Sequence, residues 1–588
     1  MNFIPCLISV LENAVRKAGF ETDAIHSQIR PGTDPKFGDY QFNGAMGLSR
    51  KAGIPPRQVA EKIVANLELP DFLHPPEIAG PGFLNLRIQE KWLAEQMIAM
   101  VAGDRLGVEI SSDIKTFVVD FSSPNVAKPM HVGHLRSTIL GDSIARILRF
   151  LGHRVITDNH LGDWGTQFGI ILYGFKHFLD KEAFAKDPVA ELARLYVDVR
   201  KKFNAQEDVE ETTADPVQDA CRNETAKLHH GDQENLALWK QFMPYCQQEI
   251  DEIYQRLDVK FDHTYGESFY QPMLPEVVKR LRERGLAVES EGAIAVFLKE
   301  DAPPALVQKR DGAFTYMTTD LATIKYRLDQ WKPDAILYVV DSRQALHFSH
   351  LFEISKKWLG EKTALHHVSF GSVLGADRKP IKTRSGDAVA SLANLLDEAV
   401  KLAKATYEES RKAGNESESS ISDEDLQNIS EIVGVGAVKY ADLSQNRTSD
   451  YVFNWDKMLA MDGNTATYMQ YAYARNRSIF RKSEISLQDL YAQKPKVLLE
   501  TPEERSLAIQ LFRFEEALRL SVQDFRPNQI TAYLWDLAKA YSVFFQKCPV
   551  LKATSNELKL SRLTLCDLTA RVLKQGLHLL GIQVLEKM

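Results

Sequence analysis

The chain has 588 residues, of which 44% are hydrophobic and 26% charged, and its formal net charge at pH 7 is −7. This length and composition indicate a globular protein of roughly three or four domains. The net negative charge excludes a protein that coats nucleic acid through overall positive charge, although a local basic stripe for an RNA partner is compatible with it.

The cysteines and the N-terminus indicate the compartment. The five cysteines are scattered, odd in number and never in CxxC spacing, so neither a disulfide framework nor a zinc site is indicated. The first 20 residues have no basic residue before their short apolar stretch and no small-residue cleavage site, so we expect an amphipathic helix rather than a signal peptide. No apolar run approaches the roughly 20 residues that span a bilayer. We therefore expect a cytoplasmic protein without membrane contact.

Residues 1–112 are predicted to form a mixed α/β domain. The pattern indicates a first helix, an FGDYQ segment, a helix near 57–66 introduced by Pro55 and Pro56, and a strand ending in GPGFLNLRI. The turn-rich sequence GVEISSDIK then marks the boundary of this domain.

The segment SSPNVAKPMHVGHLRSTILGD (122–142) is the most informative part of the chain. The β-branched and aromatic residues of TFVVDF (116–121) predict a buried strand before it, and apolar residues at helical spacing follow it. A helix that starts here directs free N–H groups and its positive dipole end at a ligand, which favours phosphate. His131 and His134 share one helical face, and Gly133 allows close approach of a nucleotide. Two capping or core histidines are the alternative.

The rest of the chain divides into three further regions. Strands and helices alternate over 113–390, with a charged, helical insertion at about 180–265, which is typical of a doubly wound, Rossmann-like sheet. Residues 391–460 are predicted to be a helical connecting segment, and 461–588 a helix bundle with apolar stripes at helical spacing. The predicted fold class is thus α/β plus all-α.

Several segments resemble one protein family. SPNVAKPMHVGHLRSTI resembles the HIGH motif of class I aminoacyl-tRNA synthetases in its arginyl-tRNA synthetase form. FGDYQFNGAM and AGPGFLNL resemble the N-terminal appendage of that family. Further blocks similar to the family follow in its order: LGDWGTQFG (161–169), TYMTTDLATIKYR (315–327), YVVDSRQ (338–344), VKYADLSQNRTSDYVFNWD (438–456) and GNTATYMQYAYAR (463–475).

The resemblance implies an arginine–tRNA ligase. Such an enzyme activates L-arginine with ATP, supplied as its Mg²⁺ complex, and transfers the arginyl group to the terminal ribose of tRNA(Arg). The resemblance further implies a monomer with no tightly bound cofactor and no metal site. It gives the C-terminal bundle the anticodon role and the N-terminal domain a role at the tRNA D-loop.

The first group of candidate residues is catalytic. Positioning and charge neutralisation dominate phosphoryl chemistry, and His131, His134 and the helix start fit that task. Lys128 is close enough in sequence to bring an ammonium to the same phosphates. The segment RKPIKTRSG (378–386) resembles a degenerate KMSKS loop, in which Thr383 replaces the second lysine, so that Lys382 and Arg384 are candidate cations. A solvated turn is the alternative for this segment.

The second group would bind ATP and arginine. Pro124, Gly133, Asp163 and Gln167 are the ATP candidates, although a structural turn explains the glycines around Asp163 equally well. Asp320 matches the guanidinium-binding acid of the family, for which a helix N-cap is the alternative. The other arginine candidates by resemblance are Tyr316 as a wall, Gln344, and Asp120 and Asn125 for the α-amino and carboxylate groups.

The third group would contact tRNA. Tyr468, Tyr471, Arg475 and Arg477 interleave aromatic and basic side chains, as RNA-binding surfaces do. Ordinary helix packing is the alternative.

Two other functions would require different sequence features. A non-catalytic RNA-binding paralogue would keep the bundle but lose the motif histidines or the pocket acid. Another class I synthetase, such as the cysteinyl type, would require zinc ligands that this sequence does not arrange.

Overall fold

The computed structural model describes residues 3–22, 25–32, 34–203, 215–298, 303–375, 377–379, 391–413 and 422–588. Lys382, Thr383 and Arg384, from the predicted KMSKS-like loop, lie outside the described residues. Among the helices in these ranges, none combines the length and the apolar character that a bilayer crossing requires.

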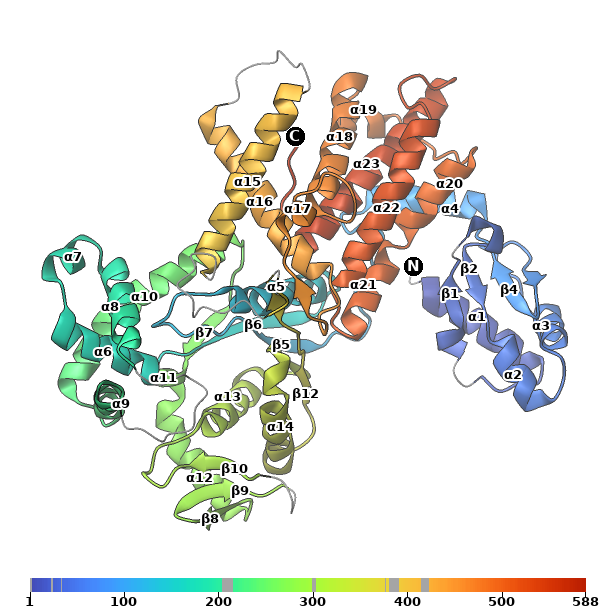
Figure 1. The fold of residues 1–588 in the computed structure, drawn as a ribbon. Coiled ribbons are helices and arrows are strands. Elements are labelled where there is room, and N and C mark those ends of the chain that lie inside the picture. Colours follow the sequence, from blue (N-terminus) through green and yellow to red (C-terminus); the bar gives the residue numbers. More distant parts are fainter. Residues whose placement is uncertain are drawn as a thin grey trace.

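A five-stranded parallel sheet forms the centre of the molecule (Figure 1). Its order is β12-β11-β5-β6-β7, so the chain runs outward from β5 in one direction and later returns to the other side of β5. Open α/β sheets bind ligands where the strand order reverses in this way. The strands are β5 (Thr116–Asp120), β6 (Arg154–Leu161), β7 (His263–Gly266), β11 (Ala335–Tyr338) and β12 (Ala364–His367).

The sheet and its helices confirm the predicted doubly wound α/β fold. Almost the whole of α5 is buried, including Leu135, Ile139 and Ile144 of the predicted apolar face. The helices associated with this sheet are α5 (Val132–Phe150), α6 (Thr166–Phe178), α11 (Glu267–Tyr270), α12 (Leu274–Glu283), α13 (Tyr316–Trp331) and α14 (Ala345–Leu359), with 3-10 turns η3 (Gln271–Met273) and η4 (Ser342–Gln344).

Two smaller units extend from this sheet. The described residues between α6 and β7 form the helices α7 (Lys181–Lys186), α8 (Pro188–Lys201), α9 (Pro216–His229) and α10 (Gln233–Arg256). An antiparallel sheet that the sequence did not predict precedes α13, and its strands are β8 (Ala287–Ser290), β9 (Ala293–Val296) and β10 (Ala305–Gln308). These strands are only four residues long, which leaves a weak periodic signal.

The N-terminal region folds around a four-stranded antiparallel sheet in the order β1-β2-β4-β3. Pro56 is the first residue of α3 and Pro55 its N-cap, as the Pro-Pro pair predicted. The elements are α1 (Phe3–Lys17), η1 (Ile25–Gln28), β1 (Ile29–Pro31), η2 (Pro35–Phe37), β2 (Tyr40–Phe42), α2 (Ala45–Ala52), α3 (Pro56–Ala65), β3 (Glu77–Ala79), β4 (Phe83–Leu86) and α4 (Glu90–Ala102).

The C-terminal region is helical, as predicted, with one exception. The short strands β13 (Val373–Leu374) and β14 (Tyr451–Val452) pair in parallel and connect it to the sheet domain. The helices are α15 (Leu392–Ala413), α16 (Asp423–Leu443), α17 (Trp455–Met458), α18 (Ala466–Ser483), α19 (Leu487–Ala492), α20 (Pro502–Phe512), α21 (Phe514–Gln523), α22 (Asn528–Lys547) and α23 (Asn556–Leu579).

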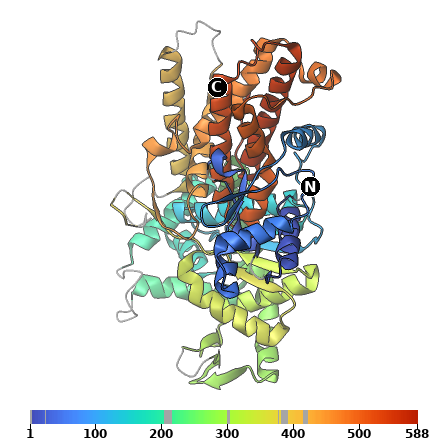
Figure 2. The ribbon, with the colours of Figure 1, turned by 90° about the vertical axis from the view of Figure 1, so that its right-hand side faces the viewer.

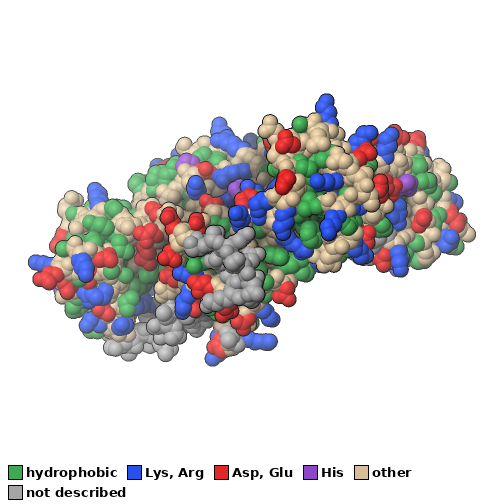
Figure 3. Space-filling view, turned by 90° about the horizontal axis from the view of Figure 1, so that it is seen from above, with side chains coloured by type: hydrophobic (Ala, Val, Ile, Leu, Met, Phe, Trp, Pro, Cys, Tyr) green, Lys and Arg blue, Asp and Glu red, His purple; other side chains and the backbone are tan. Residues whose placement is uncertain are grey.

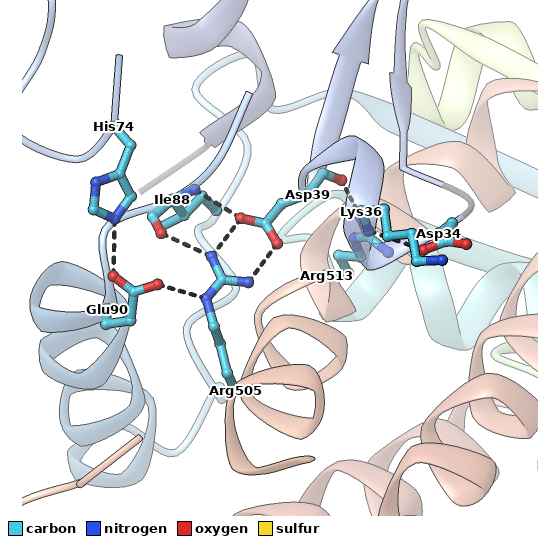
Figure 4. Close-up of polar contacts among 8 residues, drawn as sticks. All are labelled: Asp34, Lys36, Asp39, His74, Ile88, Glu90, Arg505 and Arg513. Atoms are coloured by element: carbon cyan, nitrogen blue, oxygen red, sulfur yellow. Dashed lines mark hydrogen bonds and ion pairs between the residues drawn. The ribbon is translucent and has the colours of Figure 1, made fainter. Parts of the chain in front are cut away.

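The N-terminal region lies beside the bundle, on the right in Figure 1 and facing the viewer in Figure 2. Arg505 of α20 joins the two through what we call the Arg505 clasp (Figure 4). Its guanidinium donates to both oxygens of Asp39 at 2.8 Å and to Glu90 at 2.8 Å. Next to the clasp, the Phe512 ring lies 5.2 Å from Phe3 and 5.4 Å from Trp92, measured between centroids.

Candidate functional site

The two motif histidines form the N-terminal cap of α5. His131 is the N-cap residue, and its Nδ1 accepts a hydrogen bond from the Gly133 backbone N–H at 3.0 Å. The Nδ1 of His134 accepts from the backbone N–H of His131 at 3.1 Å. The predicted alternative, capping histidines, is therefore realised, and it uses only one nitrogen of each ring.

These bonds determine the protonation of both rings. A neutral imidazole that accepts at Nδ1 carries its proton on Nε2, so each histidine has a donor left for a ligand. Burial, with Lys128 and Arg343 nearby, lowers the pKa of His131 to about 4. Burial, His131 and Lys128 lower the pKa of His134 well below its ordinary value. Both rings are thus neutral donors at pH 7.

The turn between β5 and α5 is held in an unusual backbone conformation. Ser122 and Ser123 have φ values of 72° and 48°, in the left-handed region that costs a non-glycine residue about 1 kcal/mol or more. Ser137 stabilises it by accepting the Ser122 N–H at 2.8 Å. Strain of this kind collects where a functional turn must have one shape.

Asn125 lies directly against the loop that follows β6. A Cβ atom at Gly162 would come within 2.2 Å of Asn125 Oδ1, so any other residue at this position would displace the Asn125 side chain. The Gly162 N–H also donates to the Pro124 carbonyl at 3.0 Å. The structure therefore brings Pro124 and Asn125 next to the predicted LGDWGTQFG block.

A buried charge cluster lies where Asp120, the last residue of β5, pairs with Asp158 of β6. Arg327 of α13 donates to Asp120 at 2.7 Å and to Asp158 at 2.8 Å, and its side chain is fully buried. Ser123 donates to the other oxygen of Asp120 at 3.1 Å. Asp158 Oδ1 is buried without a hydrogen-bond partner among the described residues. Two carboxylates facing one guanidinium leave one negative charge in excess when both are ionised.

Asp163 has an internal role that the sequence did not predict. Both of its oxygens accept hydrogen bonds from Ser268, at 2.8 Å from the backbone N–H and 2.5 Å from the hydroxyl. Only 4% of the residue is exposed. These contacts fix the start of α11 and give both Asp163 oxygens partners within the protein.

The side chains of Gln167 and Tyr316 both approach Gly165. A Cβ atom at Gly165 would lie 2.6 Å from Gln167 Oε1 and 3.9 Å from the Tyr316 hydroxyl. Tyr316 is the first residue of α13 and is 64% exposed, an unusual position for a large aromatic side chain. Gln344 is exposed at the end of η4, immediately before α14.

Asp320 is not a helix cap, so that alternative is wrong. Thr315 is the N-cap of α13, and Asp320 is the fifth residue of the helix. Its Oδ2 lies 2.6 Å from Nε2 of His347, on α14. About a quarter of each side chain is exposed, so the carboxylate remains accessible.

Glu267, the first residue of α11, adds a carboxyl group that the sequence did not predict. Burial, together with the charges of Asp163 and Asp320, raises its pKa to about 8. A buried carboxyl group whose pKa is raised further by neighbouring carboxylates marks a place where a bound cation would be favourable. The position of Glu267 directly after the strand end at Gly266 was the one signal of this role in the sequence.

The predicted RNA-contacting residues of α18 differ in their surroundings. Tyr471 is 40% exposed, whereas the Tyr468 ring packs 5.3 Å from Trp535. Arg475 lies 4.1 Å above the Phe545 ring, and Arg477 forms a 3.0 Å ion pair with the buried Asp567. Helix packing, the stated alternative, thus accounts for Tyr468 and Arg477.

Figure 3 shows Lys and Arg side chains gathered near the middle of the upper face, beside residues that are not described. Arg481 and Lys482, in the last turn of α18, are exposed.

Within the described ranges, no group of three or more His, Cys, Asp or Glu side chains is arranged to hold a metal ion.

Comparisons with known proteins cover nearly the whole chain. Residues 6–88 match the arginyl tRNA synthetase N terminal domain, 96–455 the catalytic domain of class I (R) tRNA synthetases, and 469–588 the DALR anticodon binding domain. An arginine–tRNA ligase of Rhodopirellula baltica is 44% identical over 95% of this chain and 96% of its own length. One of Histophilus somni is 43% identical over the full length of both chains.

Solved structures agree with these matches. The arginyl-tRNA synthetase of Plasmodium falciparum superposes with a TM-score of 0.83 at 31% identity, covering 100% of this chain and 99% of its own. The Thermus thermophilus enzyme has the same fold, with a TM-score of 0.80 at 24% identity over 99% of this chain and all of its own.

Proposed function

The chain belongs to the arginyl-tRNA synthetase family and is an arginine–tRNA ligase of class I, and from this premise we propose a role for each part of its site. In the reaction, an arginine carboxylate oxygen attacks the α-phosphorus of ATP and pyrophosphate leaves. A hydroxyl of the terminal tRNA ribose then attacks the arginyl carbonyl, and AMP leaves. A non-catalytic paralogue is not favoured, because His131, His134 and Asp320 are all present.

The start of α5 would stabilise the phosphates. The Nε2–H groups of His131 and His134 would donate to phosphate oxygens, and the positive end of the α5 dipole would add to this stabilisation. Lys128 supplies a cation, a role that Lys382 and Arg384 would share. Pro124, Gly133 and Gln167 would shape the nucleotide site, and Asp163 supports it through α11. Mg²⁺ would enter with ATP as part of the substrate.

The carboxyl groups of α11 and α13 would bind the arginine side chain. Asp320 accepts the guanidinium, and Glu267, whose raised pKa marks an unmet demand for a cation, lies within electrostatic reach of Asp320. Tyr316 and Gln344 would complete the walls of this pocket. Asn125, and the excess negative charge around Asp120, would hold the α-carboxylate and α-ammonium ends.

The tRNA would contact the bundle and the N-terminal region. Tyr471, Arg475, Arg481 and Lys482 are our candidates on α18, with Tyr468 and Arg477 supporting the helix from within. We keep the division into 1–112, 113–390, 391–460 and 461–588 as a proposal for four functional units. A monomer acting in the cytoplasm, where tRNA is charged for protein synthesis, is part of the same proposal.

The carboxylate pair Asp320 and Glu267 carries the assignment of the substrate pocket. The test is ATP–pyrophosphate exchange with each amino acid, with and without total tRNA, using the wild-type chain and Asp320→Asn. We expect exchange with arginine alone, and a selective rise in the KM of arginine in the variant because an amide removes one charge and one acceptor. Equal changes in the KM of arginine and of ATP would contradict the pocket assignment.

A further inference from the structure

His347 is placed to control the orientation of Asp320. The 2.6 Å contact joins His347 Nε2 to Asp320 Oδ2 across the packed helices α13 and α14. An ionised carboxylate only accepts hydrogen bonds, so the imidazole donates. The bond uses one lone pair of Oδ2 and leaves the other lone pair of Oδ2 and both of Oδ1 for a ligand.

Asp320 requires such support because of its position. As the fifth residue of α13 it lies beyond the helix cap, and His347 is its sole hydrogen-bond donor within the described part of the chain. The neighbouring Glu267 offers no cation to hold it, because it is a second carboxyl group, and the charge of Asp320 helps to raise its pKa to about 8. Without an external donor, the Asp320 side chain would be free to adopt other rotamers.

His347 is itself held in place. It is the third residue of α14, directly after the turn that carries Gln344. The neighbouring Phe348 meets the imidazole edge-on, with centroids 5.5 Å apart at 85°. Phe348 is buried and packs 5.1 Å from the Tyr338 ring at the end of β11. Packing against the central sheet therefore holds the His347 imidazole in place, and the imidazole in turn orients the Asp320 carboxylate.

We propose that His347 is a positioning residue for arginine recognition, which orients the Asp320 carboxylate for a bidentate pair with the guanidinium. This inference rests on the proposed guanidinium-binding role of Asp320. A planar guanidinium fork needs a carboxylate in one fixed plane, whereas nucleotide binding at the start of α5 does not depend on it. Loss of His347 therefore affects the arginine side of the reaction alone.

The test compares His347→Ala with His347→Gln in tRNA aminoacylation by the full chain. The amide N–H of glutamine keeps a donor near the position of Nε2. We expect His347→Ala to raise the KM of arginine about tenfold, the scale of one hydrogen bond to a charged group, while the KM of ATP and kcat at saturating arginine stay within about twofold. His347→Gln should recover most of the loss. His350→Ala, on the next turn of α14, is the matched control and should leave all three constants unchanged.

A second readout does not depend on turnover. Agmatine has the guanidinium of arginine but no carboxylate, so its inhibition constant reports on the side-chain pocket. We expect His347→Ala to raise the inhibition constant of agmatine by the same factor as the KM of arginine. In the Asp320→Asn background, His347→Ala should have no further effect, because the acid that it positions is already lost.

The outcomes separate this inference from the pocket assignment. If Asp320→Asn raises the arginine KM and His347→Ala does not, the positioning role is wrong and the pocket assignment stands. If Asp320→Asn itself leaves arginine and agmatine unaffected, the pocket assignment is wrong and the role of His347 falls with it. A loss in His347→Ala that His347→Gln does not recover, or that affects ATP equally, would also overturn the positioning role.

Discussion

The rings of His131 and His134 lie against each other, with centroids 3.9 Å apart and planes inclined by 31°. Each ring closes the end of α5 with Nδ1 and leaves Nε2 for a ligand. The same two side chains thus cap the helix and, in the proposed mechanism, complete its phosphate-binding face. Substitutions can separate these two roles, because a shorter polar residue can cap a helix without replacing an imidazole donor.

We predict that His131→Ala slows adenylate formation by about 2–4 kcal/mol of activation free energy, the scale of a lost preorganised donor. The variant should also lose about 1 kcal/mol of unfolding free energy, because the N-cap is removed. His131→Asn retains a capping oxygen and should recover the stability but not the rate. Single-turnover kinetics and thermal unfolding measure the two effects. A normal rate in His131→Asn would leave His131 with a capping role only.

We predict that binding of a guanidinium becomes tighter as the pH rises toward 8. The Glu267 carboxyl, with its pKa raised to about 8, is mostly protonated at pH 7, and a bound cation favours its ionised form. Binding below that pKa therefore releases a proton, so affinity rises by at most about tenfold per pH unit and levels off above pH 8. Agmatine inhibition is the measurement, since agmatine lacks the α-ammonium group of arginine. If the pH dependence persists in Glu267→Gln, a titrating group other than Glu267 causes it.

Lys128 is predicted to neutralise charge on the leaving pyrophosphate. Its ammonium already lowers the pKa of both motif histidines, which places its field at the start of α5. Lys128→Ala should lose most pyrophosphate exchange, Lys128→Arg should retain part of it, and Thr383→Lys should partly restore the Ala variant. Near-normal exchange in Lys128→Ala would rule out this role.

The Arg505 clasp is predicted to support tRNA use without affecting adenylate chemistry. Burial opposes the charge of Glu90, but hydrogen bonds that include those from His74 and Arg505 outweigh it and lower its pKa to about 2. Arg505→Ala leaves the buried Asp39 carboxylate without its charged partner, which costs about 3 kcal/mol. We expect a higher KM for tRNA, with unchanged KM values for arginine and ATP.

Arg57→Ala is the matched control for the clasp, because Arg57 forms an exposed pair with Glu61 within the same N-terminal region. It should change neither stability nor the KM of tRNA. A similar effect in both variants would indicate that the clasp has no special role.

The sequence predicted those features that local pattern determines. The strand before His131, the helix after it and the cap formed by Pro55 and Pro56 all follow from residue spacing over a few turns. The buried face of α5 was also predictable from the helical spacing of its apolar residues. Each of these elements is set by neighbours in the chain.

The remaining features depend on contacts between distant segments. Arg327 meets Asp158 across 169 positions, and Ser268 occupies the oxygens of Asp163 across 105. Nothing near Asp163 in the sequence distinguishes a carboxylate that holds a helix from one that binds a nucleotide. His347 had no motif that linked it to Asp320, and only the packing of α13 on α14 brings them together.

The aromatic contacts around Phe512 have a consequence for shortened chains. Phe3 and Trp92 cover one side of Phe512, while Asp39 and Glu90 neutralise Arg505 on the same helix. A chain that starts at residue 113 would uncover this apolar surface and leave a partly buried guanidinium without its carboxylates. Gene fusions or deletions that treat the N-terminal region as a detachable appendage would therefore damage the C-terminal helix bundle itself.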